Sequence, residues 1–212
     1  MATSIDLFAY LAAFVSVVLA LAIGDWVQSF HRLLRARARV RWSLAAVLAA
    51  FLVFFAILEE FFGLWRLAGV EQFTYVDLLV LIFPPILLSI AAMTVLPDEV
   101  PASGIDLREH YMENRRLLLL LLSLWVVGVF IRLTDLHEVV TGRQASLPEL
   151  AVQFPWQTIP LFGLFALLSW SGNMKVQLLG LAAALVLVNS AMIHRTIEAG
   201  QPTDSNSIST TR

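Results

Sequence analysis

The sequence predicts an all-α integral membrane protein, a polytopic bundle of six transmembrane helices. Hydrophobic residues make up 59% of its 212 residues and charged residues only 14%, with a mean hydropathy of +0.80. Soluble domains are about 45–50% apolar and about 25% charged, so a water-soluble fold would have too few polar side chains to cover its surface. Disorder of the whole chain is excluded too, because disorder needs low hydrophobicity and high net charge.

Uncharged stretches supply the six helices, since about 20 apolar residues cross a hydrocarbon core about 30 Å thick. They are Leu7–Gly24, Trp42–Leu58, Leu78–Pro97, Leu117–Ile131, Leu150–Met174 and Val176–Ile193. With their flanks we expect spans at about 7–30, 43–66, 76–97, 115–133, 156–172 and 175–195, all within one domain, 1–199. The Ser/Thr-rich segment 200–212 is expected to be a disordered polar tail.

The first span carries two patterns. Small residues recur every four positions, which lets another backbone approach closely; they are Ala12, Ser16, Ala20 and Gly24. This stripe predicts either a contact with another subunit or packing inside one bundle, and Gly180 with Ala184 repeats it in the sixth span. Asp25, Gln28 and Arg32 share a second face at spacings of three and four, which predicts an Asp–Arg pair at the membrane boundary.

Basic residues predict the orientation of the chain, because cytoplasmic loops carry an excess of Lys and Arg. One side receives Arg32, Arg35, Arg37, Arg39, Arg41, Arg108, Arg115, Arg116 and Lys175, and the other Arg66, Arg132, Arg143, Arg195 and Arg212. We therefore expect a bacterial inner (plasma) membrane protein with both termini outside. The run His31–Arg41 predicts a basic helical extension at the leaflet surface, in contact with anionic lipid headgroups.

Two adjacent carboxylates, Glu59 and Glu60, lie in the second span. A charge at a span centre costs about 2.5–3.5 kcal/mol on insertion scales, so such residues rarely face lipid. Nearby carboxylates repel in a low dielectric, which favours a proton or cation between them. The alternative is an ion-pair network with Arg66, Arg132 or His194 that holds the bundle together.

Pro84 and Pro85 lie near the middle of the third span. They remove two backbone donors and predict that this helix is broken at Pro84–Pro85. Broken helices coordinate ions in many transporters, although proline kinks also occur without that role. In the sixth span, Asn189 and His194 lie in the outer half, at the depth expected for the glutamates and Arg132, and these groups together are candidates for one vestibule.

The loop Pro97–Asn114 is the largest on the basic side. Ser103 and Asp106 resemble a capping box that opens a helix continuing through Arg116 into the fourth span. Asp106 and His110, four apart, are a candidate pair for a metal site, and a solvated, charged helix is the alternative. On the opposite side, residues 147–154 are expected to form a short interfacial helix.

Several chemistries are excluded. The absence of cysteine removes disulfides, thiolate catalysis and iron–sulfur clusters. The four histidines form no paired metal motif, and no phosphate-binding loop or nucleophile elbow is present. No catalytic residue, cofactor or nucleic-acid partner is therefore predicted, and an enzymatic activity is the least favoured hypothesis.

The first span ending in RLLRARARVR, followed by DLREHYMENRR before the fourth span, resembles a diffuse group of bacterial six-helix membrane proteins. The resemblance covers most of the chain and implies no particular activity or site.

Three function hypotheses follow. The first is a small ion or proton-coupled channel or transporter, in which Glu59 and Glu60 bind the cation, Arg66 and Arg132 tune their charge, and the Pro84–Pro85 break supplies backbone oxygens or a gate. The alternative is a non-catalytic scaffold or accessory subunit that docks a partner through the loop 97–114. A membrane enzyme acting on a lipid or quinone is a third hypothesis. We expect the chain to form a homo-oligomer or to be a subunit beside a membrane partner.

Overall fold

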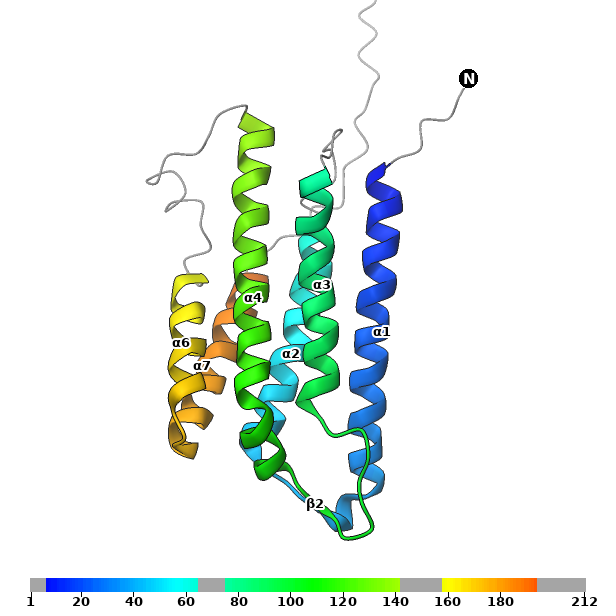
Figure 1. The fold of residues 1–212 in the computed structure, drawn as a ribbon, viewed down its shortest axis with the longest axis vertical. Helices are drawn as coiled ribbons and strands as arrows, with labels where there is room; N and C mark the ends of the chain where they lie inside the picture. The colour runs from blue at the N-terminus through cyan, green and yellow to red at the C-terminus, as the bar shows by residue number, and fades with distance from the viewer. Residues whose placement is uncertain (1–6, 65–74, 142–157, 194–212) are drawn as a thin grey trace, which may run out of the picture.

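The computed structural model describes residues 7–64, 75–141 and 158–193. Its helices are α1 (Leu7–Arg35), α2 (Leu44–Gly63), α3 (Tyr75–Val95), α4 (Leu107–Thr141), α6 (Thr158–Trp170) and α7 (Met174–Ile193). A short 3-10 turn, η1 (Arg37–Arg39), and two strands, β1 (Val40–Arg41) and β2 (Ile105–Asp106), complete the elements. The predicted all-α class is confirmed (Figure 1).

Four helices are long and apolar enough to cross a membrane: Ala9–Arg35, Leu44–Gly63, Tyr75–Val95 and Leu107–Arg132. Two shorter apolar stretches, Thr158–Trp170 and Met174–Ser190, lie in α6 and α7. At 1.5 Å per residue, the 13 residues of α6 extend only about 20 Å. The length and composition of these four helices are therefore those of a membrane protein. That six helices cross the membrane stays a prediction. The predicted helix at 147–154 lies outside the described residues.

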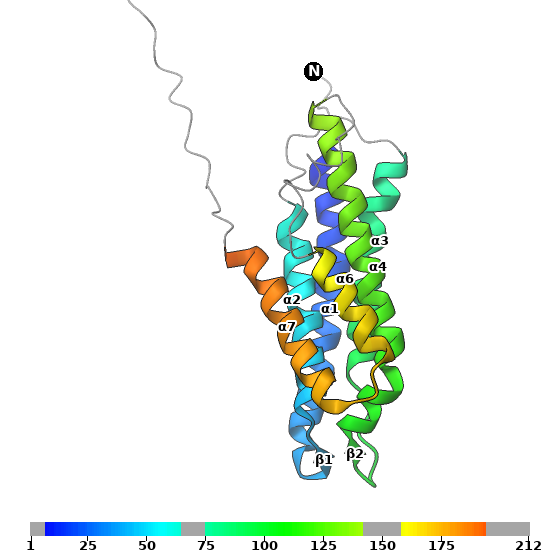
Figure 2. The ribbon, with the colours of Figure 1, turned by 90° about the vertical axis from the view of Figure 1, so that its left-hand side faces the viewer.

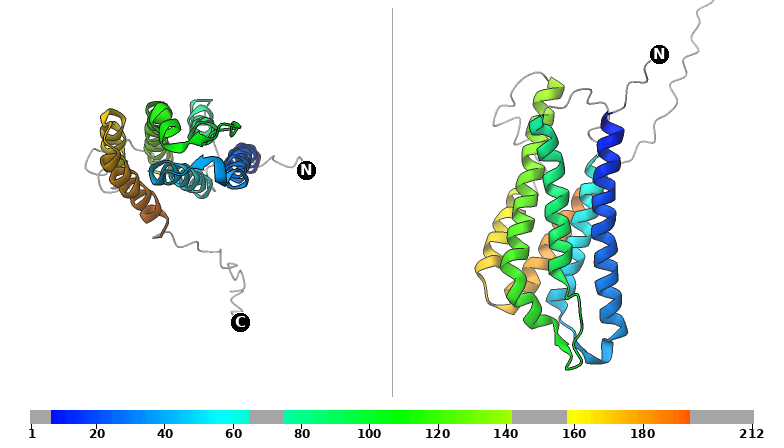
Figure 3. Two further views of the ribbon diagram at one scale, coloured as in Figure 1. Left: turned by 90° about the horizontal axis from the view of Figure 1, so that it is seen from below. Right: turned by 45° about the vertical axis from the view of Figure 1, so that its right-hand side comes forward.

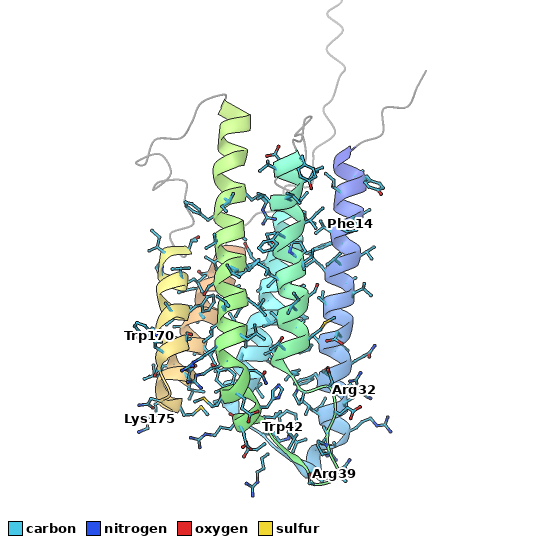
Figure 4. The ribbon with its side chains drawn as sticks, in the orientation of Figure 1. Phe14, Arg32, Arg39, Trp42, Trp170 and Lys175 are labelled. Atoms are coloured by element: carbon cyan, nitrogen blue, oxygen red, sulfur yellow. The ribbon has the colours of Figure 1, made fainter. Side chains whose placement is uncertain are left out.

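The helices form two layers of three. Seen from below, α3, α4 and α6 lie in one layer and α1, α2 and α7 in the other (Figure 3). The connections after α1, α3 and α6 all lie at one end of the bundle (Figures 1 and 2). Arg32, Arg39 and Lys175 are found at this end (Figure 4), so the loops predicted to share the basic side do share one end.

The predicted break in the third span is not present in α3, which runs without interruption from Tyr75 to Val95 through both prolines. Close packing accounts for this. Pro84 and Pro85 are buried, and a Cβ added at Gly128 of α4 would lie 2.8 Å from Pro84 Cγ. The bare backbone at Gly128 lets α4 press directly against the proline ring, and this contact supports α3 where two of its backbone hydrogen bonds are lost.

The small-residue stripe of α1 is only partly covered by the bundle, since Ala12 and Ser16 are half-buried. The buried face of α1 is formed by large residues, among them Leu19 and Trp26, whose indole N–H donates to the Ala50 carbonyl oxygen at 2.8 Å. Ala20 and Gly24 are exposed, and a Cβ at Gly24 would meet nothing within 4 Å. In α7, by contrast, Gly180 packs tightly against the Leu168 side chain, and Ala184 is buried.

The loops at the basic end differ from the predicted ones in two respects. The helix α1 stops at Arg35, and the chain continues through η1 into β1 instead of extending as a basic helix. The cap of α4 is Asp106 rather than Ser103: the Asp106 Oδ1 accepts the Arg108 backbone N–H at 2.8 Å, and Ser103 is exposed. As predicted, α4 continues from this loop through Arg116 into the apolar segment.

Candidate functional site

A buried ion pair joins α2 to α4. Glu60 is 1% exposed and Arg132 is 9% exposed. The two guanidinium nitrogens bind the two carboxylate oxygens: Arg132 Nη1 donates to Glu60 Oε1, and Nη2 donates to Oε2 at 3.1 Å. The indole Nε1 of Trp125 also donates to Oε2, at 3.0 Å. The carboxylate thus receives three hydrogen bonds from one helix.

Local sequence explains how these groups meet. Trp125 and Arg132 are seven residues apart on α4, which places them on the same face. Gly63 follows Glu60 by one turn of α2, and a Cβ added there would lie 3.4 Å from Arg132 Nη2. The missing side chain at Gly63 leaves room for the guanidinium, so the fork can meet both carboxylate oxygens.

The geometry is that of a closed, charge-compensated pair. Bidentate Arg–carboxylate contacts are among the strongest and most directional hydrogen bonds in proteins. Away from water, each charge needs the other, because an isolated ion is costly to desolvate. The ion pair therefore holds α2 and α4 together at a fixed position along their axes.

Of the residues predicted to line one vestibule, the described structure brings Glu60 and Arg132 together. Glu59, the neighbour of Glu60 on α2, is half-buried. Asn189 is also half-buried and donates to the Leu185 carbonyl oxygen of its own helix at 2.8 Å. Arg66 and His194 lie outside the described residues. Trp125 was not singled out from the sequence, although its spacing of seven residues from Arg132 indicates that both lie on one face of the helix.

The predicted pair on α1 is not formed. Arg32 Nη1 donates to the Asp98 backbone oxygen at 2.5 Å, and Nη2 donates to Gln28 Oε1 at 3.1 Å. Asp25 Oδ2 and Ser29 Oγ are buried and have no hydrogen-bond partner among the residues that the structure describes. Arg32 therefore ties α1 to the loop after α3 rather than to Asp25.

A second buried polar group, which the sequence did not indicate, anchors the last two helices. Gln177 is fully buried; its Oε1 accepts the Tyr111 hydroxyl at 2.6 Å, and its Nε2 donates to the Leu168 and Ser171 carbonyl oxygens at 2.6 Å each. These bonds satisfy carbonyls at the C-terminal end of α6, which have no partner within that helix. Gln177 thereby fixes the turn between α6 and α7 to α4.

The candidate metal pair is not supported. Asp106 is engaged in capping α4, and the His110 ring nitrogen Nδ1 lies 3.4 Å from Asn114 Nδ2. Across residues 7–64, 75–141 and 158–193, no group of three His or acidic side chains is placed to hold a metal ion.

Comparisons with protein families, with characterised proteins and with solved structures find no match to this chain.

Proposed function

We propose that this chain is a non-catalytic membrane scaffold or accessory subunit, and that its buried charges hold the bundle together. The observation that carries the proposal is the closure of Glu60 by Arg132 and Trp125. A carboxylate that moves ions must exchange its ligand with water during each cycle. Glu60 is instead held by three donors at 1% exposure, as expected for a structural contact between helices.

We propose that the partner docks on only part of the loop 97–114. Residues 105–106 form β2, and α4 starts at Leu107 and is tied to α7 through Tyr111. The exposed part of the loop is Asp98, Glu99 and Pro101–Ser103. We assign the partner contact to this segment, and a contact with a second copy to the exposed Ala20 and Gly24 side of α1.

Flux and stability measurements separate this proposal from transport. Purified protein in proteoliposomes is placed under an imposed potential, while internal pH and monovalent cations are followed. We expect no flux above empty liposomes, and we expect Glu60→Gln to lower the melting temperature. A wild-type flux that Glu60→Gln abolishes at unchanged melting temperature would contradict the scaffold function.

A loop exchange tests the partner contact. Replacing residues 98–103 by a Gly/Ser stretch of equal length keeps Gly104 and the β2 pairing. We expect the variant to fold with unchanged helicity and to lose its co-purifying membrane or cytoplasmic partner. A Gly/Ser exchange of the three-residue turn 171–173, at the same end, is the control. An unchanged partner set would count against docking through this segment.

Ion or proton transport is the second candidate, and Asp25 favours it. Its carboxylate oxygen Oδ2 and the Ser29 hydroxyl are buried on one face of α1 without a hydrogen-bond partner among the described residues. A passing cation or proton would find both oxygens available for binding. In the same liposomes, a flux lost in Asp25→Asn and kept in Gln28→Ala would favour this function; equal flux in both variants would remove Asp25 from consideration.

A further inference from the structure

The two loops at the basic end are joined by a backbone clasp. The strands β1 and β2 pair in parallel, with Val40 opposite Ile105 and Arg41 opposite Asp106. Gly104 precedes β2 with a φ of +88°, and a Cβ added there would lie 2.5 Å from the Arg39 backbone oxygen. A residue with a side chain would be strained by that φ and would clash with the Arg39 carbonyl. Glycine at 104 is thus required for the loops to meet.

Three further contacts hold the clasp in place. The Val40 side chain is buried, 8% exposed. Arg32 reaches from the last turns of α1 to the Asp98 carbonyl oxygen. Asp106 caps α4 immediately after β2. Both loops are therefore attached to the ends of α1, α3 and α4, and their backbone positions are fixed.

Four arginines extend from this fixed backbone. Arg35, Arg37, Arg39 and Arg41 are all exposed. Unlike the side chains of Arg32 and Arg132, none of their side chains has a hydrogen bond or ion pair with another residue of the described ranges. Asp98 and Glu99 are exposed on the facing loop, and within the described chain they form no ion pair with these arginines. Four guanidinium groups within seven residues thus keep their donors available.

The position of these arginines along the membrane normal follows from α2. Its 20 residues extend about 30 Å, the thickness of the hydrocarbon core. Trp42 lies two residues before α2 and is 42% exposed, as is common for tryptophan at the membrane interface. Arg41 and the rest of the clasp follow at the level of the headgroups, at the end of the bundle where Figure 4 shows Arg39 and Trp42.

We propose that the arginine-bearing half of this clasp, residues 35–42, is a preorganised binding surface for the phosphate groups of anionic phospholipids, and that residues 98–106 hold it in place. A guanidinium donates two parallel hydrogen bonds to one phosphate, which a lysine cannot do. Because the clasp fixes the backbone beneath the arginines, less conformational entropy is lost on binding. The surface is independent of whether the protein acts as a scaffold or a transporter.

The test compares the retention of phosphatidylglycerol and phosphatidylcholine by the detergent-solubilised protein, measured by native mass spectrometry at low ionic strength. The triple variant Arg37→Gln/Arg39→Gln/Arg41→Gln should lose preference for phosphatidylglycerol by roughly a hundredfold, from about fivefold per arginine near an anionic surface. The control Arg108→Gln/Arg116→Gln/Lys175→Gln removes three exposed charges from the same end and should lose much less of this preference, because these side chains do not extend from the clasp. Equal losses in the two variants would overturn the proposal.

Preorganisation is tested without changing any charge. Gly104→Ala should open the clasp and lower the preference for phosphatidylglycerol several-fold at unchanged helicity. Gly172→Ala, in the turn at the same end, adds a Cβ that meets nothing within 4 Å and should have no effect. A wild-type preference in Gly104→Ala would overturn the proposed preorganisation. Displacement of the lipid by inorganic phosphate at equal phosphate concentration would overturn a lipid ligand and leave a free phosphate site.

Discussion

Replacing Glu60 by leucine while keeping Arg132 leaves a guanidinium at 9% exposure inside the bundle. Both of its contacts to carboxylate oxygens are lost, and Trp125 loses the acceptor of its indole N–H. Replacing Arg132 by methionine instead leaves the carboxylate with Trp125 as its remaining hydrogen-bond donor. Replacing both residues removes both charges together and leaves only the indole without a partner.

The sizes of these effects differ enough to be measured. Breaking a buried pair by removing one partner costs about 3–5 kcal/mol, so each single variant should lose that amount of stability. The double variant should lose only about 1–3 kcal/mol, the cost of one unsatisfied buried donor. The coupling between Glu60 and Arg132 is then about 6 kcal/mol, taken from the sum of the single losses, roughly 6–10 kcal/mol, minus the loss in the double variant.

Unfolding in mixed micelles with increasing SDS, followed by circular dichroism, gives the four free energies of the cycle. A parallel cycle that combines Glu99→Leu, in the loop before α4, with Arg132→Met serves as the control and should be additive to within about 0.5 kcal/mol. If the losses of Glu60→Leu and Arg132→Met simply add in the double variant, the two side chains do not stabilise each other and the proposed structural role is wrong.

Three further outcomes are expected. Gly128→Ala should destabilise the bundle by about 1–3 kcal/mol because its methyl group would overlap a proline ring of α3; Gly163→Ala, with nothing near its added Cβ, should be neutral in the same unfolding assay. Gln177→Leu should speed hydrogen exchange in α6 and α7 and cost about 1–3 kcal/mol, and Tyr111→Phe should cost less because it removes one of the three bonds; equal effects would contradict the anchoring role. Gly24→Cys, in a chain without other cysteines, should give disulfide-linked dimers on oxidation if α1 faces a second copy, as a non-reducing gel would show.

The helices were predictable from hydropathy because each apolar stretch is bounded by charges or prolines. The ends of the helices were harder to predict from hydropathy. The segment DLREHYMENRR is charged, yet it is helical from Leu107, since helix formation depends on backbone capping and propensity while hydropathy reports only depth in the membrane. The prolines of α3 were expected to break it, and whether a helix tolerates proline depends on the neighbouring helix, here through Gly128.

The sequence predicted an ion pair for the glutamates of α2, but it left open which of three cationic residues forms it. The sequence offered Glu60 three cationic groups, and chain spacing cannot say which helix packs beside α2. The Tyr111–Gln177 bond joins residues 66 positions apart, and neither residue forms part of a recognisable motif. The clasp was not foreseen either, because strands of two residues have no periodicity to detect.

The distance in sequence between Glu60 and Arg132 has a consequence for biosynthesis. Their positions differ by 72, and at about 5–20 residues per second the ribosome needs roughly 4–14 s to reach the second from the first. During that interval α2 has left the ribosome without the helix that neutralises its carboxylate. Nascent chains ending before α4 should therefore be held at the insertion machinery or degraded, and codon changes that slow translation between the two positions should lower the yield of inserted protein.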